Sequence, residues 1–569
     1  MSRTTADRFS FSSQRQALLD QLLAEEGAGP GERTSIPRRS DAGSAPLSFA
    51  QQRLWFLHQM ESDPASYNLP LGLRLEGELA PAALRRSVEE VVARHEVLRT
   101  RFVEEGGEPV QRIDPPGPFA LPVVDLGSLP AQAREERLRR ALAAEARTPF
   151  DLERAPLLRG VVVRLSEREH ALLMTMHHIV SDGWSVAVLT RELKAHYEAR
   201  TGGAAAGLPP LPVQYGDFAA WQRERLQGGG LEARLEYWVR QLAGAPAEVE
   251  LPADHPRPAV QRFRGTTLPV HIPAPRVDSL RGLARGEGAT LFMALLAGFS
   301  AFLHCYTGQD DLVVGTPSSG REHPEVEPLI GCFINVLPLR TRPRPGVGFR
   351  GLLRDVRDVT LAAFQHQEVS FGHIVDALAL PRDTSRNPLV QVLFALQNTP
   401  AARFRLLGVE ARVLEVDSGT SRYDLSLYLR EAADGSVAGH AELNTDLFEP
   451  STVERWLEHF GRLLAALAAD PERPVGAAEL LSGEERERIL REWNRTELPF
   501  DPRDGAVHRF EAQVRRTPGA EALVCGDERL SYAELNRRAN RWAHELAALG
   551  AGPEVRVGIL LERSVDMVV

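Results

Sequence analysis

Apolar residues along the chain recur at two spacings. Stretches with an apolar residue at every third or fourth position are typical of amphipathic helices, and short runs rich in Val, Ile and Leu are typical of buried strands. The first spacing predicts helices at 49–60, 81–94, 131–146, 185–200, 289–304, 349–365 and 451–468. The second predicts strands at 69–75, 97–103, 157–165, 170–176, 265–272, 311–315, 333–340, 389–397 and 422–429. This alternation of helices and strands indicates an α/β fold.

Both ends of the chain depart from this pattern. Residues 1–45 hold one short amphipathic patch and a linker rich in Gly, Pro and Ser, so we interpret them either as a tether or as a docking helix for a partner protein. The pattern breaks again near residue 483, and residues 483–506 are predicted to be a linker. A new unit is predicted at 507–569, and the length of 569 residues suits three or four globular units.

Composition and charge narrow the class of protein. A net charge of −10 gives no reason to expect binding to nucleic acid or to an anionic membrane. Cys305, Cys332 and Cys525 lack metal-binding spacing and predict neither a zinc site nor a disulfide framework, as in a reducing cytoplasm. The polar N-terminus does not resemble a secretory signal, and the most apolar stretch, 291–303, is shorter than the roughly 20 residues of a membrane span.

Candidate chemistry lies in Met174-Thr-Met-His-His-Ile-Val-Ser-Asp-Gly-Trp-Ser185, where a predicted strand runs into a turn and a helix. Neighbouring residues of a strand point to opposite faces, so only one of His177 and His178 can face a cavity. Histidine is the side chain best suited to proton transfer near neutral pH. The stretch has neither a serine nucleophile at a fixed offset nor the spacing of metal ligands. It predicts either direct transfer between two bound substrates or two histidines that serve only as core residues.

The segment His177-His-Ile-Val-Ser-Asp-Gly183 resembles the signature of nonribosomal peptide synthetase condensation domains, which are relatives of chloramphenicol acetyltransferase. Six further segments resemble the other motifs of that family and occur in the family's order. They are SFAQQRLWFL at 48–57, RHEVLRTRF at 94–102, YGDFAAWQ at 215–222, IGCFINVLPLR at 330–340, HQEVSF at 366–371 and RDTSRNPL at 382–389.

The resemblance implies an α/β fold of two chloramphenicol acetyltransferase-like lobes, which form a V-shaped pseudodimer with a central tunnel. The N-lobe is expected at 46–215 and the C-lobe at 216–482, with residues 315–321 crossing from the C-lobe to floor the tunnel. Residues 507–569 resemble the start of the family's adenylation domain, with Leu530-Ser-Tyr-Ala-Glu-Leu535 as its first motif. The late catalytic lysine of that domain has no counterpart, since Lys194 is the only lysine, so amino-acid activation is not expected.

The resemblance also implies an amide-forming acyltransferase. One carrier protein domain presents an aminoacyl, peptidyl or acyl thioester, and the amine of a second carrier-bound aminoacyl group attacks it. Both substrates are expected on 4′-phosphopantetheine arms of partner carrier proteins and other synthetase modules, so the chain itself is expected to bind no cofactor and no metal. Holding two tethered substrates at one point replaces a bimolecular encounter by positioning.

By this resemblance His178 is the histidine that faces the substrates, either as general base or as the group that holds the amine and the intermediate. His177 is expected to be structural. Asp182 is expected to pair with an arginine such as Arg99, and Gly183 to let the backbone pass close to the substrate. Four further residues are expected along the tunnel, with an ordinary structural role as the alternative for the last two: Trp184, Ser185, Ser318 and Asn335.

Two other functions stay open for this pattern. An epimerisation domain shares the signature of the two histidines, but it normally follows a carrier domain and does not precede an adenylation domain. A condensation-like domain that only recruits partners usually lacks the second histidine or the Asp-Gly pair, and both are present here. Among condensation domains, the motifs favour the type that joins an L-configured donor to an L-configured acceptor, while a starter role with an acyl donor stays open.

Overall fold

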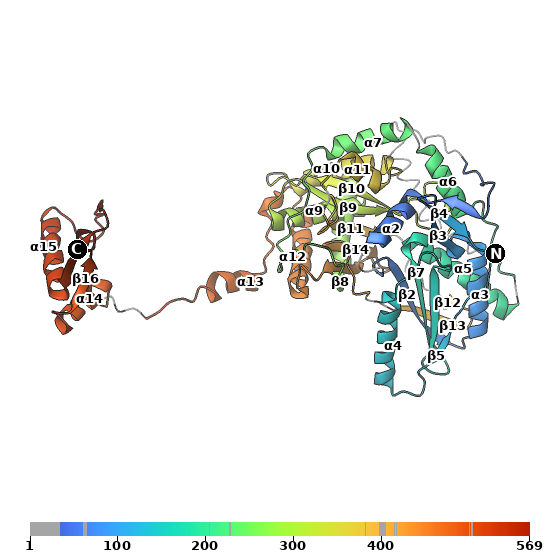
Figure 1. Ribbon diagram of the computed structural model, residues 1–569, viewed down its shortest axis with the longest axis horizontal. Coiled ribbons are helices and arrows are strands. Elements are labelled where there is room, and N and C mark those ends of the chain that lie inside the picture. Colours follow the sequence, from blue (N-terminus) through green and yellow to red (C-terminus); the bar gives the residue numbers. More distant parts are fainter. Residues whose placement is uncertain are drawn as a thin grey trace. The chain divides into compact units, whose positions relative to one another are not determined.

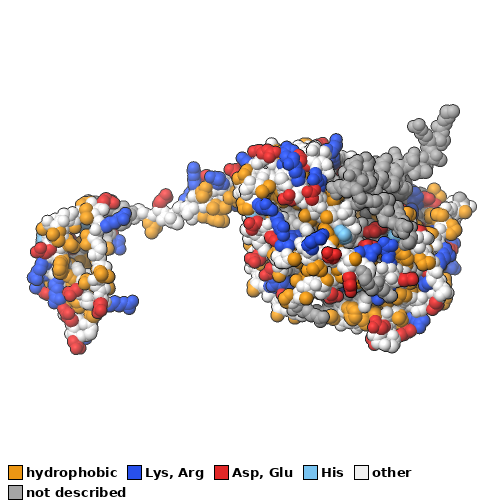
Figure 2. Space-filling model, turned by 90° about the horizontal axis from the view of Figure 1, so that it is seen from above, with side chains coloured by type: hydrophobic (Ala, Val, Ile, Leu, Met, Phe, Trp, Pro, Cys, Tyr) orange, Lys and Arg blue, Asp and Glu red, His pale blue; other side chains and the backbone are white. Residues whose placement is uncertain are grey.

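The computed structural model describes most of the chain (Figure 1). The described residues are 35–60, 65–203, 205–226, 229–381, 383–397, 405–414, 416, 418–499, 501 and 504–569. The amphipathic patch in residues 1–45 lies outside them. The chain divides into two compact units, Met1–Leu480 and Leu481–Val569, and each is described by itself. On the face shown in Figure 2, acidic and basic side chains are interspersed rather than gathered into one patch.

The N-lobe of the larger unit is built on a six-stranded sheet in the order β12-β13-β2-β7-β6-β5. Its strands are β2 (Asn68–Gly77), β5 (Val123–Asp125), β6 (Leu158–Arg164), β7 (Glu169–His177), β12 (Arg405–Leu406) and β13 (Val409–Leu414). A second, smaller sheet joins β1 (Ser44–Pro46), β4 (Glu108–Ile113) and β3 (Thr100–Glu105). The helices of this lobe are α2 (Phe49–Met60), α3 (Pro81–Arg94), α4 (Ala131–Arg147), α5 (Gly183–Gly202) and α6 (Tyr215–Arg225). Strand β7 pairs with β2 and β6 and is buried from its second residue onward, so its run of apolar residues suits a central strand.

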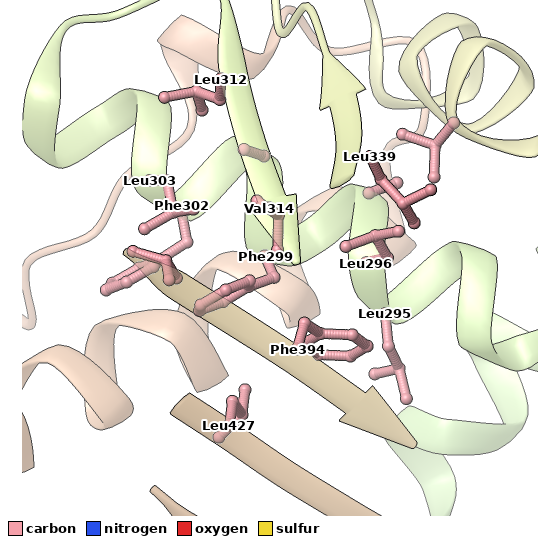
Figure 3. Packing of buried hydrophobic residues seen from close by; sticks show 14 of the residues in the cluster. Leu295, Leu296, Phe299, Phe302, Leu303, Leu312, Val314, Leu339, Phe394 and Leu427 are labelled. Carbon is pink, nitrogen blue, oxygen red and sulfur yellow. The ribbon is translucent and has the colours of Figure 1, made fainter. Parts of the chain in front are cut away.

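The C-lobe repeats this design with a six-stranded sheet in the order β10-β9-β11-β14-β15-β8. Its strands are β8 (Gly265–Ile272), β9 (Leu312–Ser318), β10 (Asn335–Thr341), β11 (Val392–Gln397), β14 (Leu425–Glu431) and β15 (Val437–Asn444). Its helices are α7 (Gly229–Leu242), α8 (Ala274–Gly286), α9 (Leu291–Thr307), α10 (Phe349–Gln365), α11 (Phe371–Ala377) and α12 (Pro450–Ala469). Figure 3 shows Phe299 and Phe302 of α9 against Phe394 of β11 and Leu427 of β14, at the centre of the core of this lobe. The two sheets with their helices confirm the predicted α/β fold of two acetyltransferase-like lobes.

Two segments of the later sequence leave the C-lobe and join the N-lobe. Strand β13 pairs antiparallel with β2, so that Val409 lies opposite Gly77 and Leu414 opposite Gly72. Between the end of β9 and the start of β10, residues 319–334 form a crossing segment, which buries Ile330 and Phe333 in the N-lobe core. The predicted crossing at 315–321 is therefore too early, because residues up to Ser318 still pair within the C-lobe sheet.

Most predicted elements are present, and the misses have physical causes. Helices α3 and α10 and strand β8 have the predicted bounds. The strand predicted at 97–103 begins only at Thr100, because residues Glu96–Arg99 form a 3-10 turn. Strand β13 was not predicted because its apolar residues do not alternate regularly, since Val413 and Leu414 are adjacent, and it depends on pairing with β2.

A helix that spans a membrane must be both long and apolar. No single helix in the described part of the chain meets both requirements. Helices α8 and α9 meet them only as a pair, and the pair is bent by 105°.

The smaller unit consists of α14 (Ala506–Arg516), β16 (Glu521–Cys525), β17 (Glu528–Ser531), α15 (Tyr532–Ala548) and α16 (Val565–Val568). A small cluster of buried residues, Leu530, Leu535 and Val565, holds it together. The hydroxyl of Ser531 accepts a hydrogen bond from the N–H of Glu534 and caps α15, which explains why the helix begins at Tyr532.

We predict that the aromatic core of the C-lobe dominates its stability. Phe394 is fully buried and packs against Phe299 with ring centroids 5.4 Å apart. Phe394→Ala should lower the free energy of unfolding by about 3–5 kcal/mol. The control is Phe56→Ala, which truncates a ring that is 48% exposed and should cost less than about 1 kcal/mol. Equal losses in urea unfolding of the two variants would contradict this assignment of the core.

Candidate active site

The candidate site lies where β7 ends at His177. A 3-10 turn, η3 (His178–Val180), follows, and the N–H of Ser181 donates to the carbonyl of His178 over 3.2 Å. Asp182 then adopts an extended conformation, and its Oδ1 accepts a hydrogen bond of 2.8 Å from the N–H of Ser185. Aspartate is among the preferred residues at the N-cap, the position just before the first turn of a helix. The local sequence therefore explains the break between strand and helix.

His177 is fully enclosed by the N-lobe core. Its Nδ1 accepts a hydrogen bond of 3.1 Å from the N–H of Ile179, which places the ring proton on Nε2. The rings of His58, Phe150 and Tyr67 surround it, with centroids 5.6, 6.1 and 6.5 Å away. Burial holds the pKa of His177 well below its usual range. A neutral, packed ring is what a structural histidine requires.

His178 occupies a different environment, on the side of the crossing segment. Its backbone N–H donates to the carbonyl of Tyr67 over 2.8 Å, and its Nδ1 lies 3.8 Å from the sulfur of Cys332. Burial, reinforced by the positive charge of Arg422, lowers the pKa of His178 to about 4, although the charge of Asp182 acts in the opposite direction. The ring is therefore neutral at neutral pH and able to accept a proton or a hydrogen bond.

Asp182 forms a buried ion pair with Arg321 of the crossing segment. The guanidinium Nη2 lies 3.2 and 3.3 Å from the two carboxylate oxygens, and both side chains are almost completely buried. The carboxylate also accepts hydrogen bonds from the hydroxyl of Ser185, over 2.7 Å, and from the N–H of Phe333, over 3.1 Å. This set of donors compensates the cost of burying the charge.

Arg321 also holds its own segment together. Its Nη1 donates to the carbonyls of Val326 and Leu329 over 2.6 and 2.8 Å, and its guanidinium lies 4.1 Å from the ring centroid of Phe333. Burial lowers the pKa of Arg321 from its usual high value, while Asp182 acts against that change. One side chain therefore joins the folded crossing segment to the start of α5.

The predicted pairing of Asp182 with Arg99 is wrong. Arg99 donates to the carbonyl of Asp114, and its nearest carboxylate partner is Glu96 at 3.9 Å. Arg99 belongs to the turn before the smaller sheet, whereas the crossing segment places Arg321 beside Asp182. Sequence order alone does not reveal that crossing.

Trp184 and Ser185 both bind the crossing segment. Ser185 is fully buried, so its predicted place along a tunnel is wrong, whereas the place of the partly exposed Trp184 stays a prediction. The indole Nε1 of Trp184 donates to the carbonyl of Glu327 over 2.9 Å. The fully buried hydroxyl of Ser185 contacts Asp182 and both the N–H and the carbonyl of Gly331. Both side chains have the contacts of structural residues.

Ser318 and Asn335 are directly opposite each other on β9 and β10. Ser318 donates to the side chain of Gln367, and the amide of Asn335 donates to the carbonyls of Gln367 and Val369 over 2.9 and 2.7 Å. The oxygen of the Asn335 side chain accepts a hydrogen bond from the N–H of Phe371 over 2.9 Å. These contacts anchor the motif at 366–371, which is the structural alternative considered for this pair.

Gly183 has free space beside it. No heavy atom of the described residues lies within 4 Å of the place where a β-carbon would stand. The backbone there is open on one side, which fits the expectation that a substrate approaches at this point, and that expectation stays a prediction.

Sequence reasoning missed three residues that complete the site: Arg321, Cys332 and Tyr215. The hydroxyl of Tyr215 donates to the carbonyl of Cys332 over 2.5 Å and lies 2.8 Å from the hydroxyl of Ser48. A β-carbon on Gly331 would stand 2.0 Å from the ring of Tyr215, so this position requires glycine. Cys332 and Tyr215 lie in the motifs at 330–340 and 215–222, so a signal for both residues was present. Their contact with each other could not be predicted from the sequence.

No group of three or more His, Cys, Asp and Glu side chains within the described residues is arranged to hold a metal ion.

Comparison with known proteins shows the family of the chain. The family model described as Condensation domain matches residues 41–490, which include both lobes. The chain belongs to the condensation-domain family. A second family model, AMP-binding enzyme, matches residues 510–569, so the condensation domain is followed by the beginning of an adenylation-type domain.

One polypeptide of the linear gramicidin synthase of Brevibacillus parabrevis is 43% identical to the chain over 527 residues. That match covers 92% of the chain and only 10% of the synthase polypeptide, so the chain spans about a tenth of the length of this relative.

Two solved structures show the same fold. The X-domain in its complex with OxyB from teicoplanin biosynthesis has a TM-score of 0.72 at 30% identity, and covers 80% of this chain and 100% of that one. The first condensation domain of the calcium-dependent antibiotic synthetase, in complex with a substrate analogue, has a TM-score of 0.66 at 25% identity. It covers 78% of this chain and 100% of that one.

We predict that the condensation domain depends on Arg321 and not on Arg99. Arg321→Met leaves the carboxylate of Asp182 buried without its cation, so the free energy of unfolding should fall by about 3–5 kcal/mol. The matched control, Arg99→Met, removes one hydrogen bond to a carbonyl and should cost about 1 kcal/mol. Denaturant unfolding of both variants measures the difference, and a larger loss for Arg99→Met would reverse the assignment.

Proposed function

We propose that this condensation domain forms a peptide bond between two carrier-bound thioesters. The donor is an aminoacyl or peptidyl group, and the attacking group is the free amine of an acceptor aminoacyl thioester. Each arrives on the 4′-phosphopantetheine arm of a partner carrier protein domain, and the open side of Gly183 is where the two meet. The observation that carries the proposal is the match of the condensation-domain family to residues 41–490, within which burial lowers the pKa of His178 and Asp182 binds Arg321.

The reaction needs little chemistry beyond positioning, because a thioester is already activated. The amine nitrogen attacks the donor carbonyl carbon and forms a tetrahedral intermediate with a negative oxygen and a positive nitrogen. Collapse of this intermediate breaks the carbon–sulfur bond, releases the donor arm as a thiol and leaves an amide. One proton leaves the nitrogen, and one proton reaches the sulfur.

The low pKa of His178 favours one of its two roles. A histidine with a pKa of about 4 is a weak base, and it does not remove the proton from an aminium ion before attack. It is suited to accept a hydrogen bond from the neutral amine and then to receive the acidic proton of the tetrahedral intermediate. We therefore propose that His178 first holds the amine and then carries the proton towards the leaving sulfur.

The motifs at 48–57 and 177–183 resemble those of the L-donor type. This resemblance supports an L-configured donor and acceptor for this domain. The motif at 48–57 forms α2, whose Gln51 donates to the carbonyl of Ile179 over 3.2 Å, next to His178. Paired reactions with L- and D-configured donor thioesters test this assignment, and a faster reaction of the D-donor would reject it.

We predict that His178→Ala lowers the rate of amide formation by at least about 100-fold. The assay incubates two carrier proteins, each loaded with an aminoacyl thioester, and measures the dipeptidyl thioester by mass spectrometry. The control is His271→Ala, at an exposed position of β8, which should keep the rate of the unaltered protein.

An unchanged dipeptide yield in His178→Ala would contradict the proposed role of this histidine. Incorporation of solvent deuterium at the α-carbon of a single carrier-bound aminoacyl group, without dipeptide, would instead identify an epimerisation domain.

A further inference from the structure

The positive charge of Arg422, a residue of the C-lobe, acts on the candidate site. Arg422 belongs to none of the seven motifs of the family. Arg422 stands just before β14, and its backbone is held on both sides. Its N–H donates to a carboxylate oxygen of Glu442 over 3.3 Å, and its carbonyl accepts from the amides of Gln261, over 3.0 Å, and Asn387. The base of the side chain is therefore fixed to the C-lobe.

The other end of this side chain reaches the N-lobe. The guanidinium carbon of Arg422 lies 5.0 Å from the ring centroid of Tyr67, a distance at which cation and ring attract each other. The carbonyl of the same Tyr67 accepts the backbone N–H of His178 over 2.8 Å. The guanidinium of Arg422, from the C-lobe, thus contacts Tyr67, the N-lobe residue whose carbonyl holds the backbone of His178.

No carboxylate of the described residues binds the guanidinium of Arg422 directly. Within the described residues, no ion pair and no hydrogen bond from its guanidinium is found, although the residue is half-buried. Glu442 binds the backbone of Arg422 and acts on its charge without pairing with the guanidinium. Arg321, by comparison, binds the carboxylate of Asp182 directly. An unpaired charge in a partly dry environment acts on its neighbours over a longer distance than a paired one.

The neighbours of Arg422 show this influence. Its charge is the largest charge effect on His178, where it adds to burial and disfavours the protonated ring, and it also acts on His177 and Cys332. The other titratable and charged groups that act on His178 or on these two neighbours are Asp182, His58, Arg159, Arg321 and Arg53. Among them, the charge of Asp182 acts on His178 itself and favours protonation, so Arg422 opposes it.

We propose that Arg422 is a positioning residue of the condensation reaction, whose positive charge, held on Tyr67, acts on His178 from across the boundary between the lobes. This inference rests on the proposed role of His178. Burial in the N-lobe is the main cause of the neutral state of His178, and the charge from the C-lobe reinforces it. A neutral residue at position 422 should let His178 take up a proton at a higher pH.

The test is an NMR titration of His178 in the full chain, with isotope-labelled histidine and the His178→Ala variant to assign the signal. In Arg422→Met, and in Arg422→Gln as a second neutral variant, the midpoint of the titration should move to higher pH by about one unit. Arg422→Lys keeps the charge and should restore the midpoint. Arg430→Met, which changes an exposed arginine of β14, is the matched control and should leave the midpoint in place.

The rate of dipeptide formation, measured against pH with the same variants, provides the second readout. The acid limb of the profile should move to higher pH in the two neutral variants and stay in place in the lysine variant and in the control. An unmoved titration midpoint in both neutral variants would overturn the inference, whatever happens to the rate. A midpoint that moves in a protein that forms no dipeptide would support the electrostatic role of Arg422 and overturn the proposed function instead.

Discussion

The buried ion pair between Asp182 and Arg321 is the interaction on which the rest of the site depends. Removing two charges from water costs several kcal/mol for each, and the pair is stable only because nearly every remaining hydrogen-bonding position is used. The carboxylate accepts from Ser185 and Phe333, and the guanidinium donates to two carbonyls of its own segment. Loss of either partner would leave the other charge buried without compensation, so the pair holds the crossing segment against the start of α5.

The motifs of the family, far apart in sequence, meet on this crossing segment. The N–H of Ile330 donates to Nδ1 of His95 over 3.3 Å, and the other ring nitrogen of His95 lies 2.8 Å from a buried oxygen of Glu192. The hydroxyl of Tyr215 holds the carbonyl of Cys332. The histidine signature, the motif at 94–102 and the motif at 215–222 therefore each bind the motif at 330–340. This explains why the motifs occur together: they are parts of one assembly that fixes the position of His178.

Much of the fold followed from the spacing of apolar residues, and so did the strand and the helix on either side of the candidate site. The run before His177 predicted a central strand, and the Asp-Gly pair predicted the turn into α5, because both features are local. The partner of Asp182 was predicted wrongly because it arrives from the other lobe, through a crossing that has no periodic signal. Ser185 was misplaced for the same reason, since its hydroxyl contacts Gly331, 146 residues away. Strand β13 escaped prediction because pairing with β2, and not its own pattern, makes it a strand.

Native-state hydrogen exchange tests most directly whether the crossing segment is locked to the N-lobe. The amides to follow are those of Ile330, Gly331 and Phe333, which donate to His95, Ser185 and Asp182. If the segment is an integral part of the N-lobe, these amides exchange as slowly as those of His177 and His178 at the end of β7, through the same global unfolding. Exchange of the three amides that is faster by orders of magnitude, while the histidine amides stay protected, would contradict the central role given to the pair of Asp182 and Arg321.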